Sequence, residues 1–278
     1  MSNSHINVLI TGGSGLIGKR LTEMLLDKGY SVSHLSRRKS EKPNIYVYEW
    51  DYKKSYIEDG AIANADYIIH LAGASVAGKR WTKSYKKEIV DSRVKTTELL
   101  LATMQNTANH VKGFFSASAI GIYGDRGTEM LPENSKPSTG FMADTVIQWE
   151  NAVDKIRQAG YRTTSNRIGV VLAPNGGVHE EMTKRFKFGV AGYFGSGNQY
   201  YPWVHAEDVC RLFLYQLENE NVQGIFNACS PNPVSMKALL KAALKARKGR
   251  ALFLPIPQFV LKIMAVSYTH LTLPTSVM

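Results

Sequence analysis

The chain has 278 residues, of which 44% are hydrophobic and 21% are charged. This length and composition exclude a disordered chain and are typical of one large α/β domain with a full core. The formal net charge of +11 fits an anionic ligand, a nucleic acid or simply a basic surface, so the charge alone does not choose among them.

The first predicted element is a strand over residues 6–10, which leads into a glycine-rich loop and then a helix. The loop reads Thr11-Gly12-Gly13-Ser14-Gly15-Leu16-Ile17-Gly18. Gly12 suits the tight turn, Gly15 leaves room for a phosphate, and Gly18 allows close packing of the helix. Backbone N–H groups at the start of a helix also attract a pyrophosphate. The loop therefore predicts a dinucleotide site, although such glycines also occur in ordinary turns.

The next elements alternate between strands and helices. Short apolar runs over residues 31–35, 45–48 and 67–71 predict strands, and their lack of alternation is typical of parallel strands buried on both faces. A long helix is predicted from residue 83 to about 104, a fifth strand over 113–119 and a helix over about 140–159. A sixth strand over 162–171 is interrupted near Gly169. This order predicts a Rossmann-type, doubly wound parallel sheet with a small C-terminal lobe on the substrate side.

No proline-rich linker divides the chain, so its parts are expected to pack together. We predict an NADP-binding Rossmann domain over residues 1–173 and a smaller substrate-side region over residues 174–266. An aromatic and glycine-rich stretch over residues 189–203 is the predicted substrate-side surface. Residues 267–278 do not continue the pattern and are interpreted as a truncation or a foreign tail.

The densest basic segment lies between residues 237 and 250. Lys237, Lys241 and Lys245 recur every four residues, opposite Leu240 and Leu244. A solvated helix face explains this spacing better than a patch for nucleic acid or membrane. The four tryptophans are not interleaved with these basic residues, so stacking on single-stranded nucleic acid is not expected.

The residues after the second strand indicate which dinucleotide binds. NAD sites usually carry an acidic residue there for the ribose diol, but this chain has Ser36 followed by Arg37 and Arg38. A hydroxyl and a guanidinium are good donors to a 2′-phosphate. Arg38 is less favoured than Arg37, because adjacent side chains of an extended segment face opposite ways. The prediction is NADP(H), with a solvated loop as the alternative.

Several separate motifs occur in one order along the chain, and together they carry a family resemblance. These motifs are Leu71-Ala72-Gly73, Lys79-Arg80-Trp81-Thr82, Asp91-Ser92-Arg93, Ser116-Ala117-Ser118-Ala119, Gly195-Ser196-Gly197-Asn198-Gln199 and Trp203-Val204-His205. With the glycine loop, they resemble the extended short-chain dehydrogenase/reductase superfamily. Within it, they are similar to the atypical epimerase family proteins of the SDR39U1-like (YfcH-like) subgroup, from about residue 6 to about residue 265.

This resemblance implies a bound NADP(H) and a set of residues that contact it. It adds Glu88 and Arg93, which are also explained as ordinary charges on a helix surface. Arg93 is able to pair with a phosphate, and Glu88 to accept a hydrogen bond from a ribose hydroxyl. The predicted cofactor site consists of Thr11, Gly12, Gly13, Ser14, Gly15, Leu16, Ile17, Ser36, Arg37, Leu71, Ala72, Gly73, Glu88 and Arg93.

The catalytic residues of this superfamily are a Ser or Thr and a Tyr-x-x-x-Lys pair, in which the ammonium lowers the phenol pKa. Ser118 fills the serine position, but Phe141 and Thr145 stand where the pair is expected. Neither can transfer a proton.

Two other residues are candidates for proton transfer. Tyr123 is the nearest substitute phenol, with a packing role as its alternative, and the predicted catalytic residues are therefore Ser118 and Tyr123. His205 has a near-neutral reference pKa of about 6.5 but is interpreted as a helix-entry residue. The scattered histidines give no metal-binding pattern.

Two functions follow from these residues. One is an NADP(H)-dependent epimerase-like, dehydratase-like or oxidoreductase-like enzyme that acts on a small hydroxyl or carbonyl compound. The other is a non-catalytic NADP(H)-binding sensor.

Cys210 and Cys229 lie in apolar segments and are interpreted as reduced thiols. With no signal sequence and no apolar run of about eighteen residues, we expect a cytoplasmic protein without a membrane or nucleic-acid partner.

Overall fold

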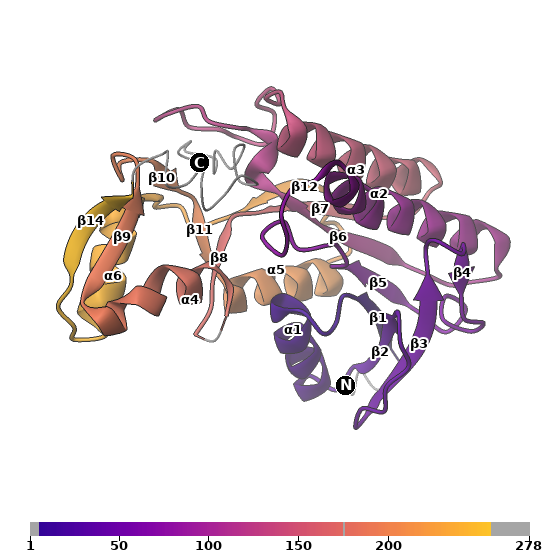
Figure 1. Cartoon of the computed structure of the whole chain (residues 1–278). Coiled ribbons are helices and arrows are strands. Elements are labelled where there is room, and N and C mark those ends of the chain that lie inside the picture. Colours follow the sequence, from indigo (N-terminus) through magenta and orange to yellow (C-terminus); the bar gives the residue numbers. More distant parts are fainter. Residues whose placement is uncertain (1–5, 175, 257–278) are drawn as a thin grey trace.

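The computed structural model describes residues 6–174 and 176–256, and an eight-stranded sheet forms its centre (Figure 1). The strand order is β12-β7-β6-β5-β1-β2-β3-β4, and only the short β4 runs antiparallel to its neighbour. The strands of this sheet are β1 (Asn7–Thr11), β2 (Ser31–Ser36), β3 (Ile45–Asp51), β4 (Tyr56–Ile57), β5 (Tyr67–His70), β6 (Gly113–Ala119), β7 (Thr163–Ile168) and β12 (Gly224–Ala228). The predicted Rossmann-type fold is confirmed.

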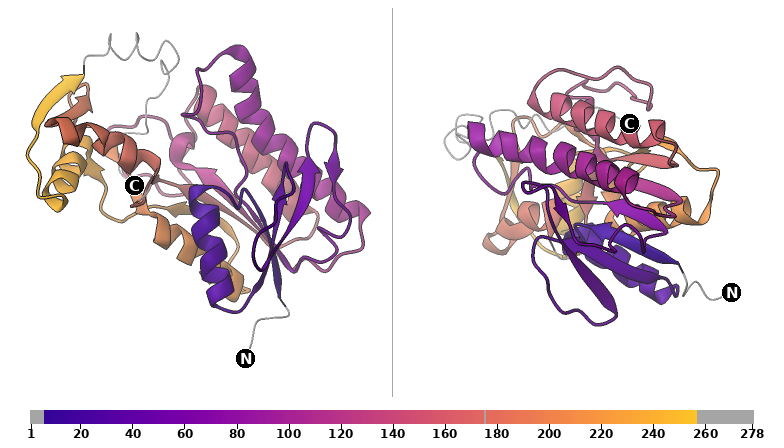
Figure 2. Two further views of the ribbon diagram at one scale, coloured as in Figure 1. Left: turned by 60° about the horizontal axis from the view of Figure 1, so that its bottom comes forward. Right: turned by 90° about the vertical axis from the view of Figure 1, so that its right-hand side faces the viewer.

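Four helices cover the two faces of the sheet. They are α1 (Leu16–Asp27), α2 (Lys83–Asn106), α3 (Phe141–Gln158) and α5 (Ala206–Glu218). The helices α2 and α3 pack together on one face, and α1 packs against α5 on the other (Figures 1 and 2). A short 3₁₀ helix, η1 (Ile120–Ile122), follows β6. The fold thus has the three layers expected of a parallel sheet buried on both faces.

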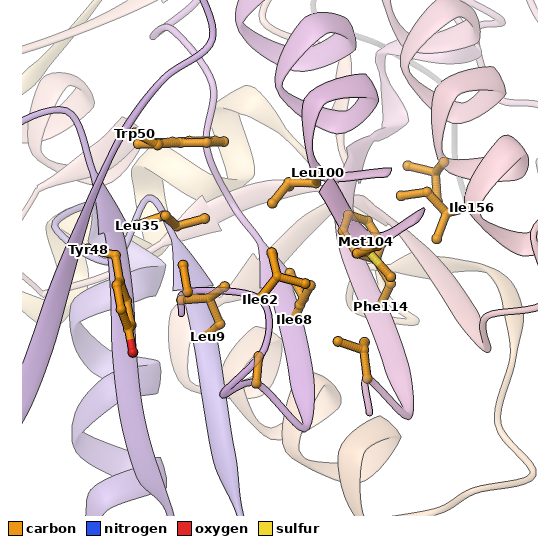
Figure 3. Close-up of a cluster of buried hydrophobic side chains, with 14 of the residues drawn as sticks. Leu9, Leu35, Tyr48, Trp50, Ile62, Ile68, Leu100, Met104, Phe114 and Ile156 are labelled. Atoms are coloured by element: carbon orange, nitrogen blue, oxygen red, sulfur yellow. The ribbon is translucent and has the colours of Figure 1, made fainter. Parts of the chain in front are cut away.

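Alternation along each strand divides the core into two halves. On the α2/α3 side, Leu9, Ile68 and Phe114 join Leu100 and Ile156 in one buried cluster (Figure 3). On the α1/α5 side, the next residues along the same strands, Ile10, Ile69 and Phe115, form a second buried cluster. Since successive side chains of a strand point to opposite faces, each of these central strands needs adjacent apolar residues in its middle. This is the physical reason for the unbroken apolar runs in the sequence.

After β7 the chain leaves the sheet at Gly169 and later returns to it. A Cβ at Gly169 would lie 2.3 Å from the Pro202 carbonyl oxygen, so the interruption expected there is also a place of close backbone approach. The segments outside the central sheet are β8 (Val170–Leu172), α4 (Gly177–Thr183), η2 (Lys184–Phe188), β9 (Val190–Phe194), β10 (Tyr200–Tyr201), β11 (Trp203–His205), β13 (Val234–Ser235), α6 (Met236–Ala246) and β14 (Leu252–Ile256).

The lobe beside the sheet has its own small core, built around Tyr201, Met236 and Leu240 (Figures 1 and 2). Beyond the predicted boundary at residue 173, the chain forms the lobe and also returns to the Rossmann domain, to which it contributes α5 and β12. In α6, Lys241 and Lys245 are exposed while Leu240 is buried, as expected for a solvated helix face. The tail over residues 267–278 lies outside the described residues.

Candidate cofactor and catalytic site

The glycine loop joins β1 to α1 at the point where the strand order reverses. The chain runs from β1 outward to β2 and β3, whereas β5, on the other side of β1, continues to β6 and β7. In an open parallel sheet, ligands bind at the carboxyl ends of the strands at such a reversal. The loop is therefore at the expected place for a nucleotide.

Close contacts explain why the loop contains glycine. Gly12 has a φ of 71°, and a Cβ there would lie 2.8 Å from the Leu71 carbonyl group. A Cβ at Gly18 would lie 2.4 Å from the Gly12 oxygen, and the Gly15 N–H donates to that same oxygen at 2.9 Å. The missing Gly18 side chain thus lets α1 approach the loop itself.

Thr11 fastens the loop to the end of β5. Its hydroxyl oxygen accepts hydrogen bonds from the backbone N–H groups of Leu71 and Ala72, both at 3.1 Å. The Thr11 hydroxyl hydrogen is then left for His70 Nδ1, 2.7 Å away. Burial lowers the pKa of His70 to about 3, and the charge of Arg93 acts in the same direction. Thr11 is fully buried and does not line the cavity itself, but it holds the backbone of Leu71 and Ala72, which do.

A cavity of about 290 Å³ lies over this reversal point. Most of the predicted cofactor residues line it, namely Gly12, Gly13, Ser14, Gly15, Ser36, Arg37, Leu71, Ala72, Gly73 and Glu88. Thr11, Leu16, Ile17 and Arg93 do not. A groove of about 430 Å³ near Asn7 and Gly29 also occurs, but these residues lie at the amino ends of β1 and β2, away from the loop.

The end of β2 carries the predicted phosphate donors. Ser36 and Arg37 both line the cavity, and Arg38 does not. The carboxylate that lines it, Glu88, already accepts a hydrogen bond from the Tyr52 hydroxyl at 2.9 Å and pairs with Lys53 at 3.3 Å. Burial, followed by this hydrogen bond, raises the pKa of the Tyr52 phenol. The edge near β2 therefore offers donors without a competing free carboxylate.

Arg93 lies behind the cavity wall. Its guanidinium donates to the backbone oxygens of Ala74 at 3.1 Å and Ile89 at 2.9 Å, and it stacks over the Trp149 ring. Burial lowers its pKa to about 10, so it still carries a charge at neutral pH. A Cβ at Gly73 would lie 3.0 Å from this guanidinium. Arg93 thus supports the segment that lines the cavity.

Sequence reasoning missed eight of the residues that line the cavity, and the two with basic side chains are His34 and Lys42. His34 is on β2, and Lys42 follows in the loop before β3. A Cβ at Gly13 would lie 2.4 Å from the His34 ring, so the loop rests directly on that ring. No spacing in the sequence reveals this contact, because the glycine loop and β2 are brought together only by the pairing of β1 with β2.

The two predicted catalytic residues belong to one buried polar network. The Ser118 hydroxyl donates to Glu150 Oε1 at 2.5 Å, and Glu150 holds Arg167 through two bonds of 2.8 and 2.7 Å. Arg167 donates at 2.7 Å to the Tyr123 oxygen, and the Tyr123 hydroxyl donates to Asn227 Oδ1 at 2.7 Å. The structure therefore brings Ser118 and Tyr123 into the same network, but neither lines the cavity.

Tyr123 is fully buried, with an exposed fraction of 0%. Burial raises the pKa of its phenol, and Arg167 opposes that rise only in part. Both of its polar functions, donor and acceptor, are used inside the protein. This arrangement matches the packing alternative for Tyr123, and its proton-transfer role stays a prediction.

Comparison with known proteins assigns the fold and the loop to a family. The NAD dependent epimerase/dehydratase family matches residues 8–229. The chain belongs to this family. It is 34% identical over 259 residues to the epimerase family protein YfhF of Bacillus subtilis (strain 168), covering 92% of this chain and 84% of that relative. The epimerase family protein SDR39U1 of Mus musculus is 31% identical over 260 residues, covering 92% and 86% of the two chains.

A solved structure gives the same result. The human epimerase family protein SDR39U1 (isoform 2), determined with NADPH, matches with a TM-score of 0.82 and 26% identity, over 98% of this chain and 91% of that one. The resemblance to SDR39U1-type epimerase family proteins is confirmed, and the NADP(H) prediction agrees with the cofactor of the human protein.

This epimerase-family chain replaces both members of the expected Tyr-x-x-x-Lys pair. Phe141 begins α3 and packs edge-on against Trp81, with the Lys86 ammonium 5.1 Å above the Phe141 ring. Thr145 is 1% exposed, and its hydroxyl donates to the Phe141 oxygen at 2.6 Å. The phenyl ring of Phe141 and the hydroxyl of Thr145 therefore stand where the phenol of Tyr and the ammonium of Lys are expected.

His205 has the helix-entry role expected from the sequence. It is the N-cap of α5, and its Nδ1 accepts a hydrogen bond from the Glu207 N–H at 3.2 Å.

Within residues 6–174 and 176–256, no helix is both long and apolar enough to cross a membrane. Over the same residues, His, Cys, Asp and Glu side chains do not gather into a group of three able to hold a metal ion.

Proposed function

We propose that this chain binds NADP(H) in the cavity at the reversal point of its sheet. The observation that supports this most directly is the composition of the cavity edge at the end of β2. Ser36 and Arg37 line it, and its carboxylate, Glu88, is already occupied by Tyr52 and Lys53. A free carboxylate at that edge would repel a 2′-phosphate, whereas a guanidinium offers it a planar fork of donors.

The pyrophosphate of the dinucleotide fits the glycine loop. The loop residues 13–15 lead into α1, whose first turn contains no acidic residue and whose N-cap, Gly15, has no side chain to satisfy the free N–H groups. Such N–H groups and the positive end of the helix dipole favour an anion. Bound NADP(H) supplies hydride chemistry, and the residues described here hold and orient it.

The chemistry that accompanies binding has two candidates. The first is epimerase-like, dehydratase-like or oxidoreductase-like action on a small hydroxyl or carbonyl compound, with Ser118 and Tyr123 beside it. The second is a non-catalytic NADP(H)-binding protein in the cytoplasm. A specific observation favours the second: Phe141 and Thr145 replace the proton-transferring pair, and Ser118 and Tyr123 have their hydrogen bonds within the protein.

Calorimetric titration with NADPH and NADH tests the binding. We expect NADPH to bind more tightly, and Arg37→Met to raise the Kd for NADPH at least about tenfold while leaving that for NADH unchanged, because a charge-assisted hydrogen bond is worth roughly 1.5–3 kcal/mol. Arg38→Met is the matched control, since Arg38 lies next to Arg37 but outside the cavity. Equal affinity of the wild type for both nucleotides would contradict the proposal.

Turnover separates the two candidates once binding is established. NADPH oxidation is followed at saturating cofactor across a panel of aldehydes, ketones and sugar derivatives. Oxidation that depends on the added carbonyl compound supports the enzyme. Epimerase-like and dehydratase-like reactions return the hydride and leave no net oxidation of the cofactor, so the same mixtures are also analysed for epimerised or dehydrated products. Tight NADPH binding with neither oxidation nor such a product supports the non-catalytic protein.

A further inference from the structure

The basic side chains between β2 and β3 differ in whether a carboxylate already pairs with them. The Lys39 ammonium is bonded to Glu58 at 2.7 Å, and neither residue lines the cavity. Arg37 and Lys42 line it, and within residues 6–174 and 176–256 no carboxylate forms an ion pair with either. The segment therefore presents two cations to the cavity, and Lys42 is the one without an assigned role.

Lys42 is held in place by a histidine whose tautomer follows from its hydrogen-bond partners. The Thr22 hydroxyl donates its hydrogen to the Gly18 oxygen at 2.7 Å. The same hydroxyl oxygen lies 2.9 Å from His34 Nε2, and it therefore accepts a hydrogen bond from that nitrogen. His34 therefore carries its hydrogen on Nε2 and keeps a lone pair on Nδ1. That lone pair accepts a hydrogen bond from the Lys42 ammonium at 3.3 Å.

The histidine is rigid and neutral. It is 2% exposed, it is fixed at both ring nitrogens, and the glycine loop lies against its ring at Gly13. Burial and the nearby Lys42 charge both favour the uncharged ring. A fixed neutral acceptor uses one of the three ammonium hydrogens and leaves two.

We propose that Lys42 is a second cation for the 2′-phosphate of NADP(H), positioned by the Thr22–His34 pair beneath the glycine loop. Arg37 and Lys42 then both contact the phosphate from the lining of one cavity, with the Ser36 hydroxyl as a neutral donor. The assignment rests on the proposed NADP(H) binding and adds a residue that determines the preference for NADPH over NADH. His34 acts through Lys42 and is a positioning residue.

The test compares four ligands that differ in one phosphate: NADPH with NADH, and 2′,5′-ADP with 5′-AMP. In Lys42→Met we expect the Kd for NADPH and for 2′,5′-ADP to rise about tenfold, with no change for NADH or 5′-AMP. Lys39→Met is the matched control and leaves all four unchanged, because Lys39 is paired with Glu58 outside the cavity. Both lysines are at least partly exposed, so the melting temperatures should match the wild type.

His34→Leu tests the positioning role. It removes the Nδ1 acceptor and fills the buried site with an apolar side chain, and we expect about a threefold loss of NADPH affinity with none for NADH. In the double variant with Lys42→Met the two losses do not add, because His34 acts only through the lysine. Losses that add fully would overturn the positioning role.

The outcomes separate this assignment from the proposed function. A wild type that prefers NADPH, together with a Lys42→Met variant of unchanged affinity, overturns the role of Lys42 and leaves NADP(H) binding intact. Equal losses for NADPH and NADH place Lys42 on the pyrophosphate and also overturn the assignment. A wild type that binds neither NADPH nor 2′,5′-ADP contradicts the proposed function itself.

Discussion

Two polar regions of this chain are built in opposite ways. At the cavity, Arg37 and Lys42 face open space without a carboxylate partner among the described residues. At the ends of β6 and β7, the side chains of Ser118, Tyr123 and Arg167 bond to other protein groups. The first region keeps donors for a ligand, whereas the second uses them within the fold.

The difference follows from the energetics of burial. A buried polar group left without a partner costs roughly 1–3 kcal/mol, so a network deep in the fold is stable only when its members satisfy one another. A partly exposed cation remains hydrated and keeps its bonding capacity until a ligand arrives. The cavity is therefore prepared for binding, and the Glu150–Arg167 pair contributes to the fold and supports the polar ends of β6 and β7.

The largest effect is expected from Arg167→Met. The change leaves the Glu150 carboxylate buried with only the Ser118 hydroxyl, and we expect a loss of about 3–5 kcal/mol in the free energy of unfolding. Urea denaturation measures it. The matched variant Arg157→Met removes an exposed pair with Asp154 and should leave the curve nearly unchanged. Equal shifts in both variants would show that the buried network does not stabilise the fold.

Mild acid tests the cavity side. The folded pKa of His34 is about 4 and that of His70 about 3, both below the ordinary 6.5, because burial disfavours the charged ring. The unfolded chain therefore binds protons first, and stability falls as the pH drops from 6.5 toward these folded values. Between pH 6 and pH 5 we expect a loss of about 2 kcal/mol from the two histidines together.

His34→Asn isolates one of these contributions. The variant is less stable at pH 7, but its further loss between pH 6 and pH 5 should be smaller than that of the wild type by about 1 kcal/mol. Urea denaturation at the two pH values gives the difference. Parallel losses in the two proteins would show that His34 titrates normally in the fold.

A change of modest size is expected from Tyr123→Phe. Removing the hydroxyl leaves Arg167 without one acceptor and Asn227 without one donor, so we expect about 1–2 kcal/mol of destabilisation. NADPH affinity should stay the same, because Tyr123 does not line the cavity. Loss of a carbonyl-dependent NADPH oxidation without loss of stability would instead assign Tyr123 to proton transfer and remove the contrast between the regions.

Much of the fold was predictable because it depends on short-range patterns. The strand over residues 113–119 was predicted at the bounds the structure shows, and the interruption at Gly169 separates β7 from β8. Both rest on local features: a short run of apolar and small residues for a strand buried on both faces, and a glycine where backbones approach. The return of the chain to the sheet as β12 was not predicted, since β12 is a five-residue edge strand that only its pairing with β7 identifies.

The sequence by itself determined the Rossmann-type fold, the glycine loop and the Ser36-Arg37 pair, because each depends on residues that are neighbours along the chain. Only the tertiary structure decided how the side chains combine. It placed Arg93 behind the cavity wall, joined Ser118 to Tyr123 through Glu150 and Arg167, and set Lys42 against His34 beneath the loop. These outcomes depend on which strands pair and which groups are buried together, and no local pattern encodes that for polar side chains.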